Sequence, residues 1–443
     1  MLRSVSGDAM NPRAFLVAPL AALPVRFRIL GLLFVLSFVN YLLRNNLSVA
    51  QPTLSHEYSL SATQFGFIYL AFNVAYTLFQ IPSGVLSDRY GPRLLLAGAA
   101  IAWGVLTALT GILPGLFPAI TGTLVALIAI RALMGVANAP MFPVAAGAFA
   151  RWFPVGQWAL PNSVLSSGLT LGQAAVGPVV AFLIVTFSWQ ASFLLLAPIG
   201  VLAGLWWWSY GRDDPREHRA VSAAERELIA TGRAPAAPAE PGAWRVVLRN
   251  RNVLLLAASY FSMNYTFYIF SNWLYTYLVE ERGFGLLAAG FLYALPFVVG
   301  AVLAAAGGAV CDFLCRRVGL LWGCRLPAIV GLLMAAWLLL AGAAAPNAYV
   351  AVALLSLCFG FTQFTEGAFW QGTTAAAGPH TATATGVLNT GGNLVGFLAP
   401  LVGFIVDSFG WWAAFVTGSA FALAAVVLWL VVRFDPIPVR EPA

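Results

Sequence analysis

Three ionisable side chains lie inside long apolar runs of the sequence: Arg44, Arg131 and Glu366. A charge at the centre of a membrane span costs about 2.5–3.5 kcal/mol on insertion scales, so each of these residues requires a partner or a function. The guanidinium of Arg44, in Asn40-Tyr-Leu-Leu-Arg44, is a planar fork that suits a carboxylate or a phosphate. We predict that Arg44 binds the acid group of an anionic ligand. The alternative is a structural pair with a buried carboxylate or with helix-end carbonyls.

Arg131 and Glu366 each allow two interpretations. Arg131 opens the segment Arg131-Ala-Leu-Met-Gly-Val-Ala-Asn138, and it either contributes to binding or holds the bundle through hydrogen bonds. Burial away from water favours the neutral form of a carboxylate, which makes Glu366 a candidate proton carrier. The alternative for Glu366 is a permanent ion pair with one of the two arginines.

Further polar and aromatic residues recur at intervals of four, which places them on one helix face. Asn264 pairs with Tyr268 in this way, Glu366 with Trp370, and Asn389 with Asn393. Amides and hydroxyls can bind ligand hydroxyls, or they can bond between helices for roughly 0.6–2 kcal/mol each. The candidate substrate-binding set is Arg44, Tyr76, Arg131, Asn264, Tyr268, Trp370, Asn389 and Asn393.

The composition is that of a membrane protein with many spans. Of the 443 residues, 60% are hydrophobic and 9% are charged, against about 25% charged in soluble domains. The net charge is +7, but the arginines fall in short links between apolar runs, so we expect no nucleic-acid partner. The cysteines form no disulfide framework, and no His or carboxylate cluster completes a metal site beside Cys311 and Cys315. We predict no cofactor and no metal.

Crossing a bilayer takes about 20 apolar residues as a helix. By this measure the sequence predicts an all-α integral membrane protein of twelve transmembrane helices in two six-helix halves. The predicted spans are 27–50, 62–86, 93–114, 120–148, 161–187, 190–211, 252–279, 286–312, 325–345, 348–377, 382–407 and 410–433.

The only long link separates the two halves. We expect a tail at 1–25, one half at 26–211, a linker at 212–250, the second half at 251–434 and a tail at 435–443. Ser222 followed by Glu225 resembles a capping box, which predicts a short surface helix in the linker.

Arginine is concentrated in the links after even-numbered spans, which predicts that these links and both termini are cytoplasmic. One such link, Gly84-Val-Leu-Ser-Asp88-Arg89-Tyr-Gly91-Pro-Arg93, is a charged tight turn between two apolar runs. Its second copy in a six-plus-six repeat would contain Asp312. We therefore predict a conformational role for Gly84, Asp88, Arg89, Gly91, Arg93 and Asp312.

The chain resembles the anion:cation symporter branch of the major facilitator superfamily. The resemblance rests on Asn40 through Arg44, Gln80 through Arg93, Arg131 through Pro143, Arg151 through Pro154, and Asn389 through Asn393, and it covers nearly the whole chain. It implies the major facilitator fold, with the first, fourth, seventh and tenth spans around a central cavity. It also implies that the arginine of the first span engages the acid group of the substrate.

Two residues depart from the family pattern. Proton-coupled members often have an Asp where this chain has Leu43, and a Glu where it has Asn138. Organophosphate exchangers usually add an Arg in the seventh span, where this chain offers Asn264 and Tyr268. We therefore expect no exchange of highly charged phosphates, and Glu366 is the remaining candidate for proton coupling.

The resulting hypothesis is a monomeric carrier in the bacterial inner membrane. It would import a small organic anion, such as a sugar acid, together with a proton by alternating access. An uncoupled facilitator or an anion antiporter remains an alternative within transport, and a non-transporting membrane sensor is the alternative outside it. An enzyme is not expected, because no nucleophile–base pair or phosphate loop occurs.

Overall fold

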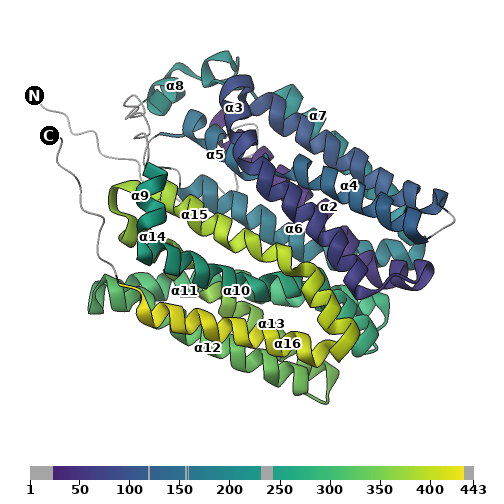
Figure 1. Cartoon of the computed structure of the whole chain (residues 1–443). Coiled ribbons are helices and arrows are strands. Elements are labelled where there is room, and N and C mark those ends of the chain that lie inside the picture. The colour runs from purple at the N-terminus through teal and green to yellow at the C-terminus, as the bar shows by residue number, and fades with distance from the viewer. Residues whose placement is uncertain (1–22, 118–119, 155–156, 158, 231–242, 434–443) are drawn as a thin grey trace, which may run out of the picture.

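The computed structural model describes residues 23–433, except 118–119, 155–156, 158 and 231–242, and this part of the chain forms helices and turns without strands (Figure 1). The helices are α2 (Val25–Tyr58), α3 (Ala62–Ile112), η2 (Leu113–Leu116), α4 (Ile120–Asn138), α5 (Met141–Trp152), α6 (Ala159–Thr186), α7 (Trp189–Tyr210), η3 (Pro215–Glu217), α8 (Ala223–Ala230), α9 (Ala243–Arg249), α10 (Arg251–Thr276), η4 (Tyr277–Glu281), α11 (Leu286–Val318), α12 (Leu320–Ala344), α13 (Ala348–Phe364), α14 (Glu366–Ala377), η5 (Gly378–His380), α15 (Thr381–Leu394), η6 (Val395–Leu398) and α16 (Ala399–Val431).

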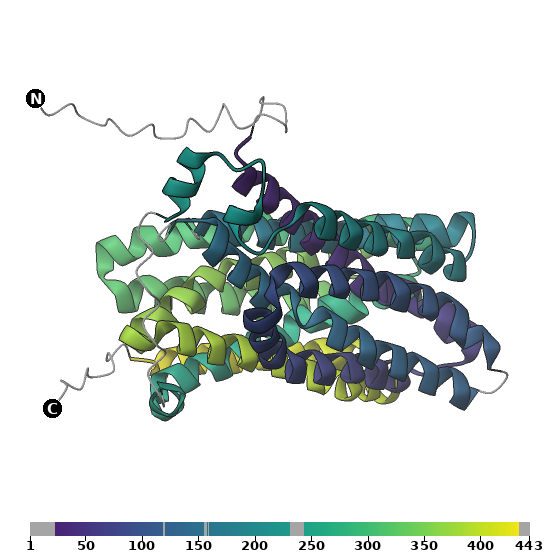
Figure 2. The same ribbon diagram turned by 90° about the horizontal axis from the view of Figure 1, so that it is seen from above.

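The helices form two groups that run along a common long axis, α2–α7 in one and α10–α16 in the other (Figures 1 and 2). Between the groups, α6 packs on α11, α3 on α16, and α2 on α10. The linker helices α8 and α9 lie at one end of the bundle, here called the linker end. The opposite end, where α2 is followed by α3, is called the far end.

Ten helical stretches among the described residues are long and apolar enough to cross a membrane. Two of them, Ala62–Leu116 and Thr383–Val431, contain 55 and 49 residues. At 1.5 Å per residue each would extend for more than about 70 Å, which is more than twice a hydrocarbon core of about 30 Å. Both bend at a glycine with positive φ, Gly91 at 82° and Gly410 at 77°. These glycines fall in or next to the links predicted between the second and third spans and between the last two.

Other predicted spans are interrupted near their polar residues. The span predicted at 120–148 is divided into α4 and α5, and Asn138 is the last residue of α4. The span predicted at 348–377 is divided at Thr365 into α13 and α14, and Glu366 is the first residue of α14. Such breaks free backbone groups inside the bundle, which is tolerated where they are buried in protein or line a cavity.

The linker packs against the start of the first helix. The predicted helix near Ser222 is confirmed as α8, and the Ser222 hydroxyl accepts a hydrogen bond from the Glu225 N–H at 3.2 Å. The Glu225 carboxylate accepts from the backbone N–H groups of Val25 and Arg26 at 3.2 and 3.0 Å. Glu225 thus caps α2 across the fold. The Pro/Ala tract at 231–242, residues 1–22 of the predicted N-terminal tail and the whole predicted tail at 435–443 lie outside the described residues.

Candidate functional site

Arg44 lies near the middle of the 34-residue helix α2, surrounded by aromatic rings. Its guanidinium carbon is 5.2 Å from the ring centre of Tyr41, 4.6 Å from that of Phe72 and 5.0 Å from that of Tyr76. It also interacts with the hydroxyl of Tyr268 from α10, in the other half of the chain. Cation–π contacts stabilise a guanidinium by about 0.5–2 kcal/mol, but they leave its charge uncompensated.

Arg131 is buried beside Arg44 and makes hydrogen bonds to groups of α2. It donates one hydrogen bond to the backbone carbonyl of Arg44 at 2.8 Å and another to the side-chain oxygen of Asn46 at 3.3 Å. Both acceptors belong to α2, so Arg131 fixes α2 against α4, in keeping with the bundle-holding interpretation. In the described part of the chain, no carboxylate is a partner of Arg44 or Arg131.

Polar residues of α10 and α15 lie on the side of Tyr268 that faces away from α2. The Tyr268 hydroxyl donates to the side-chain oxygen of Asn393 at 3.4 Å, and the Asn393 amide donates to the backbone carbonyl of Asn389 at 3.0 Å. The Asn264 amide donates to the carbonyl of Tyr260 at 2.9 Å. A Cβ at Gly392 would lie 2.9 Å from the Asn264 amide nitrogen, so this glycine allows the two helices to meet. Among the predicted binding residues, the structure therefore brings Arg44, Tyr76, Tyr268 and Asn393 together.

Glu366 lies in a separate cluster with two aromatic donors. Tyr260 donates to its two oxygens at 3.2 Å each, and the Trp370 indole donates to one oxygen at 2.9 Å. Its carboxylate is also at the N-terminus of α14, where the helix dipole favours negative charge. The alternative of a permanent ion pair with Arg44 or Arg131 is wrong for this conformation, because hydroxyl and indole groups hold the carboxylate.

Polar contacts not foreseen from the sequence join the helices around Arg44. The Asn40 amide donates to the Asn138 side-chain oxygen at 2.5 Å. The Asn45 amide donates to Gln173 at 2.6 Å, and Gln173 donates to the Ser271 hydroxyl at 2.7 Å, which crosses between the halves. Gln173 could have been found by the rule applied to Arg44, since it is a polar residue inside an apolar run.

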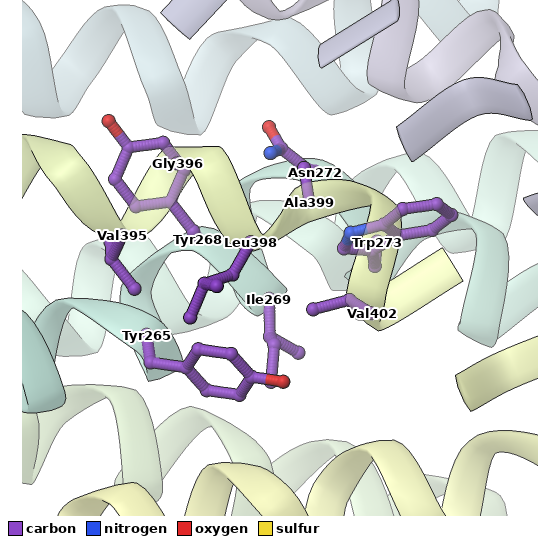
Figure 3. Close-up of a pocket in the computed structure, with 10 residues that line it drawn as sticks. All are labelled: Tyr265, Tyr268, Ile269, Asn272, Trp273, Val395, Gly396, Leu398, Ala399 and Val402. Carbon is purple, nitrogen blue, oxygen red and sulfur yellow. The ribbon is translucent and has the colours of Figure 1, made fainter. Parts of the chain in front are cut away.

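A small cavity adjoins the Tyr268 side chain (Figure 3). In the figure, Tyr268 and Asn272 point to one side of α10 and Tyr265 points to the other. Arg44 does not line this cavity, which belongs to the second half of the chain. Its lining residues are Tyr265, Tyr268, Ile269, Asn272, Trp273, Val395, Gly396, Leu398, Ala399 and Val402.

The two halves are in close contact at the far end. The Asp407 carboxylate accepts hydrogen bonds from the N–H groups of Ala62 and Thr63 at 3.0 and 2.7 Å, and from the Thr63 hydroxyl at 2.6 Å. These donors form the N-terminus of α3, where an anion is favoured. Between another pair of helices of the two halves, a Cβ at Gly177 of α6 would lie 2.4 Å from the Gly290 carbonyl of α11. The far end is therefore closed in this structure.

The predicted conformational turn is present, but its main acidic residue is not the expected one. Asp88 and Arg89 are exposed, and Asp312 is exposed as well. The carboxylate that fixes the turn belongs to Asp213: it accepts from the Arg93 N–H at 2.8 Å and fills the space where a Cβ of Gly91 would lie. The Arg93 side chain donates to the Trp208 carbonyl at 2.9 and 2.8 Å, while a Cβ at Gly84 would meet only Pro143, at 3.9 Å.

The fold and sequence together decide the family. Residues 33–400 match the family model of the Major Facilitator Superfamily. The chain belongs to this superfamily. It is therefore a multi-pass membrane transport protein and not an enzyme.

Among curated relatives, the Hexuronate transporter of Bacillus subtilis is 31% identical over 93% of this chain and 95% of its own length. The Probable sulfoacetate transporter of Cupriavidus necator is 31% identical over 87% of this chain and 88% of its own length. A solved bacterial homologue of the human lysosomal transporter Spinster superimposes with a TM-score of 0.73 at 20% identity, covering 92% of this chain and 95% of that one. The last comparison supports the fold alone.

Proposed function

We propose that this protein transports a small organic anion, a carboxylate with hydroxyl groups such as a sugar acid, by alternating access. The observation that carries the proposal is the environment of Arg44: a guanidinium in the middle of a membrane helix, held by aromatic rings and a tyrosine hydroxyl, without a carboxylate partner in the described residues. An unpaired charge in a membrane interior is costly. A substrate carboxylate would supply the missing negative charge through a bidentate hydrogen bond.

The groups around Arg44 suit the rest of such a substrate. Tyr76, Tyr268, Asn393 and Asn264 offer hydroxyl and amide groups for substrate hydroxyls. Trp370 and Asn389 would contribute farther from Arg44, and Arg131 would act by positioning α2. The two curated relatives described above are named as transporters of hexuronate and of sulfoacetate, which are small organic anions.

Transport would proceed through twelve membrane crossings in two six-helix halves. This count supposes that each of the two overlong stretches crosses the membrane twice, on either side of its kink at Gly91 or Gly410, and the two kinks support it. We place the arginine-rich linker end in the cytoplasm of a bacterial cell and the far end outside the inner membrane. In that orientation, the contact between Asp407 and α3 closes the site to the outside, and its release would open it.

Import with a proton is the favoured direction, with Glu366 as the proton carrier. Protonation would change how Glu366 accepts from Tyr260, whose hydroxyl joins α10 to α14, and from Trp370 of α14 itself. An uncoupled facilitator or an anion antiporter is the second candidate. It is favoured by the lack of any contact between Glu366 and Arg44 among the described residues.

The test is uptake by the full-length protein in proteoliposomes. Labelled sugar acids, a dicarboxylate and a neutral sugar are supplied with and without an inward proton gradient. Arg44→Lys retains the charge but loses the fork, and we expect substrate affinity to fall by roughly 10- to 150-fold, the equivalent of about 1.5–3 kcal/mol for a hydrogen bond to a charged group. Arg219→Ala, an exposed linker arginine, is the matched control.

Glu366→Gln separates the two candidates. Loss of gradient-driven accumulation with retained exchange supports proton coupling. If Glu366→Gln responds to the proton gradient as the wild type does, the coupling belongs to another group. If the wild type itself does not respond to the gradient, the facilitator is favoured. Uptake of neutral sugars that Arg44→Lys leaves untouched would refute the anion site.

A further inference from the structure

Three cysteines from two helices meet at the linker end of the second half. Cys311 and Cys315 lie one turn apart near the end of α11, and Cys324 lies near the start of α12. The sulfur of Cys324 is 3.9 Å from that of Cys311 and 3.8 Å from that of Cys315. All three sulfurs lie within 4.8 Å of one another. Sequence spacing pairs Cys311 with Cys315 only, and the turn at Gly319 brings in the third thiol.

These separations match those of sulfurs that share one metal ion. A tetrahedral Zn²⁺ site with Zn–S bonds of about 2.3 Å places its sulfurs roughly 3.8 Å apart. Thiolate ligands select soft ions such as Zn²⁺ and Cu⁺. The side-chain oxygen of Gln371 from α14 is 3.2 Å from the Cys311 sulfur, so a polar group already borders the position where a fourth ligand would lie.

The three thiols lie where α11 and α12 pack closely, and one of them is partly accessible. A Cβ at Gly323 would lie 2.4 Å from the Cα of Cys315, so α11 and α12 are in direct contact beside the thiols. Cys311 and Cys324 are buried, whereas Cys315 is partly exposed and provides a route for an ion. Arg316 and Arg317 follow Cys315 in the sequence, while the charged side chain that acts on Cys311 and Cys315 is Asp312, so the positive charge of the metal ion itself has to offset the thiolates.

The fourth cysteine, Cys358, is a buried thiol that lies away from the other three. Cys358 is buried in α13, and its sulfur donates to the Ala335 carbonyl at 3.2 Å. It lies outside the group of thiols that are close enough to share an ion. This is the usual behaviour of a buried free cysteine, and it makes Cys358 a matched control.

We propose that Cys311, Cys315 and Cys324 bind one thiophilic metal ion of the Zn²⁺ class through three thiolates. The ion would join the end of α11 to the start of α12 and lie against α14, the helix that begins with Glu366. The proposal does not depend on the transported substrate.

Cadmium is the probe, because Cd²⁺ bound to thiolates gives an ultraviolet charge-transfer band. The full-length protein is purified in a phosphine reductant, stripped of metal and titrated with Cd²⁺, and bound metal is measured by mass spectrometry. We expect one tightly bound Cd²⁺ per chain. Cys311→Ser, Cys315→Ser and Cys324→Ser should each weaken binding by more than the roughly 10- to 100-fold that outer-shell partners contribute, and Cys358→Ser should leave binding unchanged.

A second readout does not require variants that might misfold. In the wild-type protein, Cd²⁺ should slow maleimide labelling of the partly exposed Cys315 at least tenfold. The absence of a charge-transfer band, or labelling of Cys315 that Cd²⁺ does not slow, would overturn the proposal. Equal loss of binding in Cys358→Ser would overturn it as well.

Discussion

The contact between Asp407 and the N-terminus of α3 gives a quantitative prediction about which end of the transporter is open. The carboxylate accepts from two N–H groups and one hydroxyl, at 3.0, 2.7 and 2.6 Å. Residues 62–63 and residue 407 lie in different halves, so these hydrogen bonds exist only while the far end is closed. Asp407→Ala should therefore shift the equilibrium toward the form that is open at that end.

The size of the shift follows from two contributions. Loss of a helix cap costs about 1 kcal/mol, and loss of an exposed anion near a helix N-terminus costs about 0.3–1 kcal/mol. Together they remove about 1.3–2 kcal/mol from the closed form, a factor of roughly 10 to 30 in the equilibrium. Asp407→Asn still accepts hydrogen bonds but has no charge, so it should remove only the smaller, electrostatic contribution to the free energy of the closed form. In the wild type, high salt should weaken that same contribution.

The assay is electron-spin distance measurement between labels at His56 and Pro346, which are exposed at the far end of the two halves. The native cysteines are replaced beforehand. The longer-distance population should increase in Asp407→Ala, and less in Asp407→Asn. Glu217→Gln removes the same charge from the exposed linker and is the control. Distances in Asp407→Ala that match the wild type would refute the reasoning, since the contact would then contribute nothing to closure.

Three further predictions concern packing, stability and pH. Gly177→Val should abolish transport and hold the far end apart, because even a Cβ would lie 2.4 Å from the Gly290 carbonyl. The control variant Gly98→Val should transport normally, because no atom lies within 4 Å of a Cβ at that position. Equal activity of the two variants would contradict the close contact. Arg131→Gln should lower the melting temperature, because two charge-assisted hydrogen bonds worth about 1.5–3 kcal/mol each are lost; an unchanged melting temperature with abolished substrate binding would instead make Arg131 a direct ligand. Burial, with Arg212 and Arg28 nearby, lowers the pKa of His218, and Glu225 opposes this only in part. The folded linker therefore favours the neutral form of His218. Neutral His218 is compatible with linker docking above its ordinary pKa of about 6.5, and the docked linker loses stability as the pH falls below that value. The hydrogen-exchange protection factors of residues 212–225, which are corrected for the slower intrinsic exchange in acid, should therefore fall on acidification in the wild type and change less in His218→Gln. An identical pH response in both proteins would contradict the assignment.

Much of the architecture could be predicted from the sequence because bilayers impose strict rules. Backbone groups must be satisfied within each span, so long apolar runs must be helical, and the all-helical fold and the family membership follow. The division at 88–93 was also predictable, because Gly91 and its charged neighbours mark a turn. The exact partner of that turn was not, since Asp213 lies more than a hundred residues away in sequence.

The candidate site was predicted only in part. Polarity inside apolar runs indicated Arg44, Arg131 and Glu366, because the cost of burying a charge depends on the local run alone. The same rule could not say what each one contacts. Only the folded chain shows that aromatic rings surround Arg44, that Arg131 is used to hold α2, and that Tyr260 and Trp370 donate to Glu366.

The sequence by itself determined the class of the protein, its helical content and the short set of residues that membrane burial makes expensive, because these depend on composition and on distances along one helix. The tertiary structure decided every relation between helices. It joined Tyr268 to Arg44, Asp407 to the start of α3, Glu225 to the start of α2, and Cys324 to Cys311 and Cys315. Such pairs are separated by up to several hundred residues, and no periodicity within a single helix encodes which faces will meet.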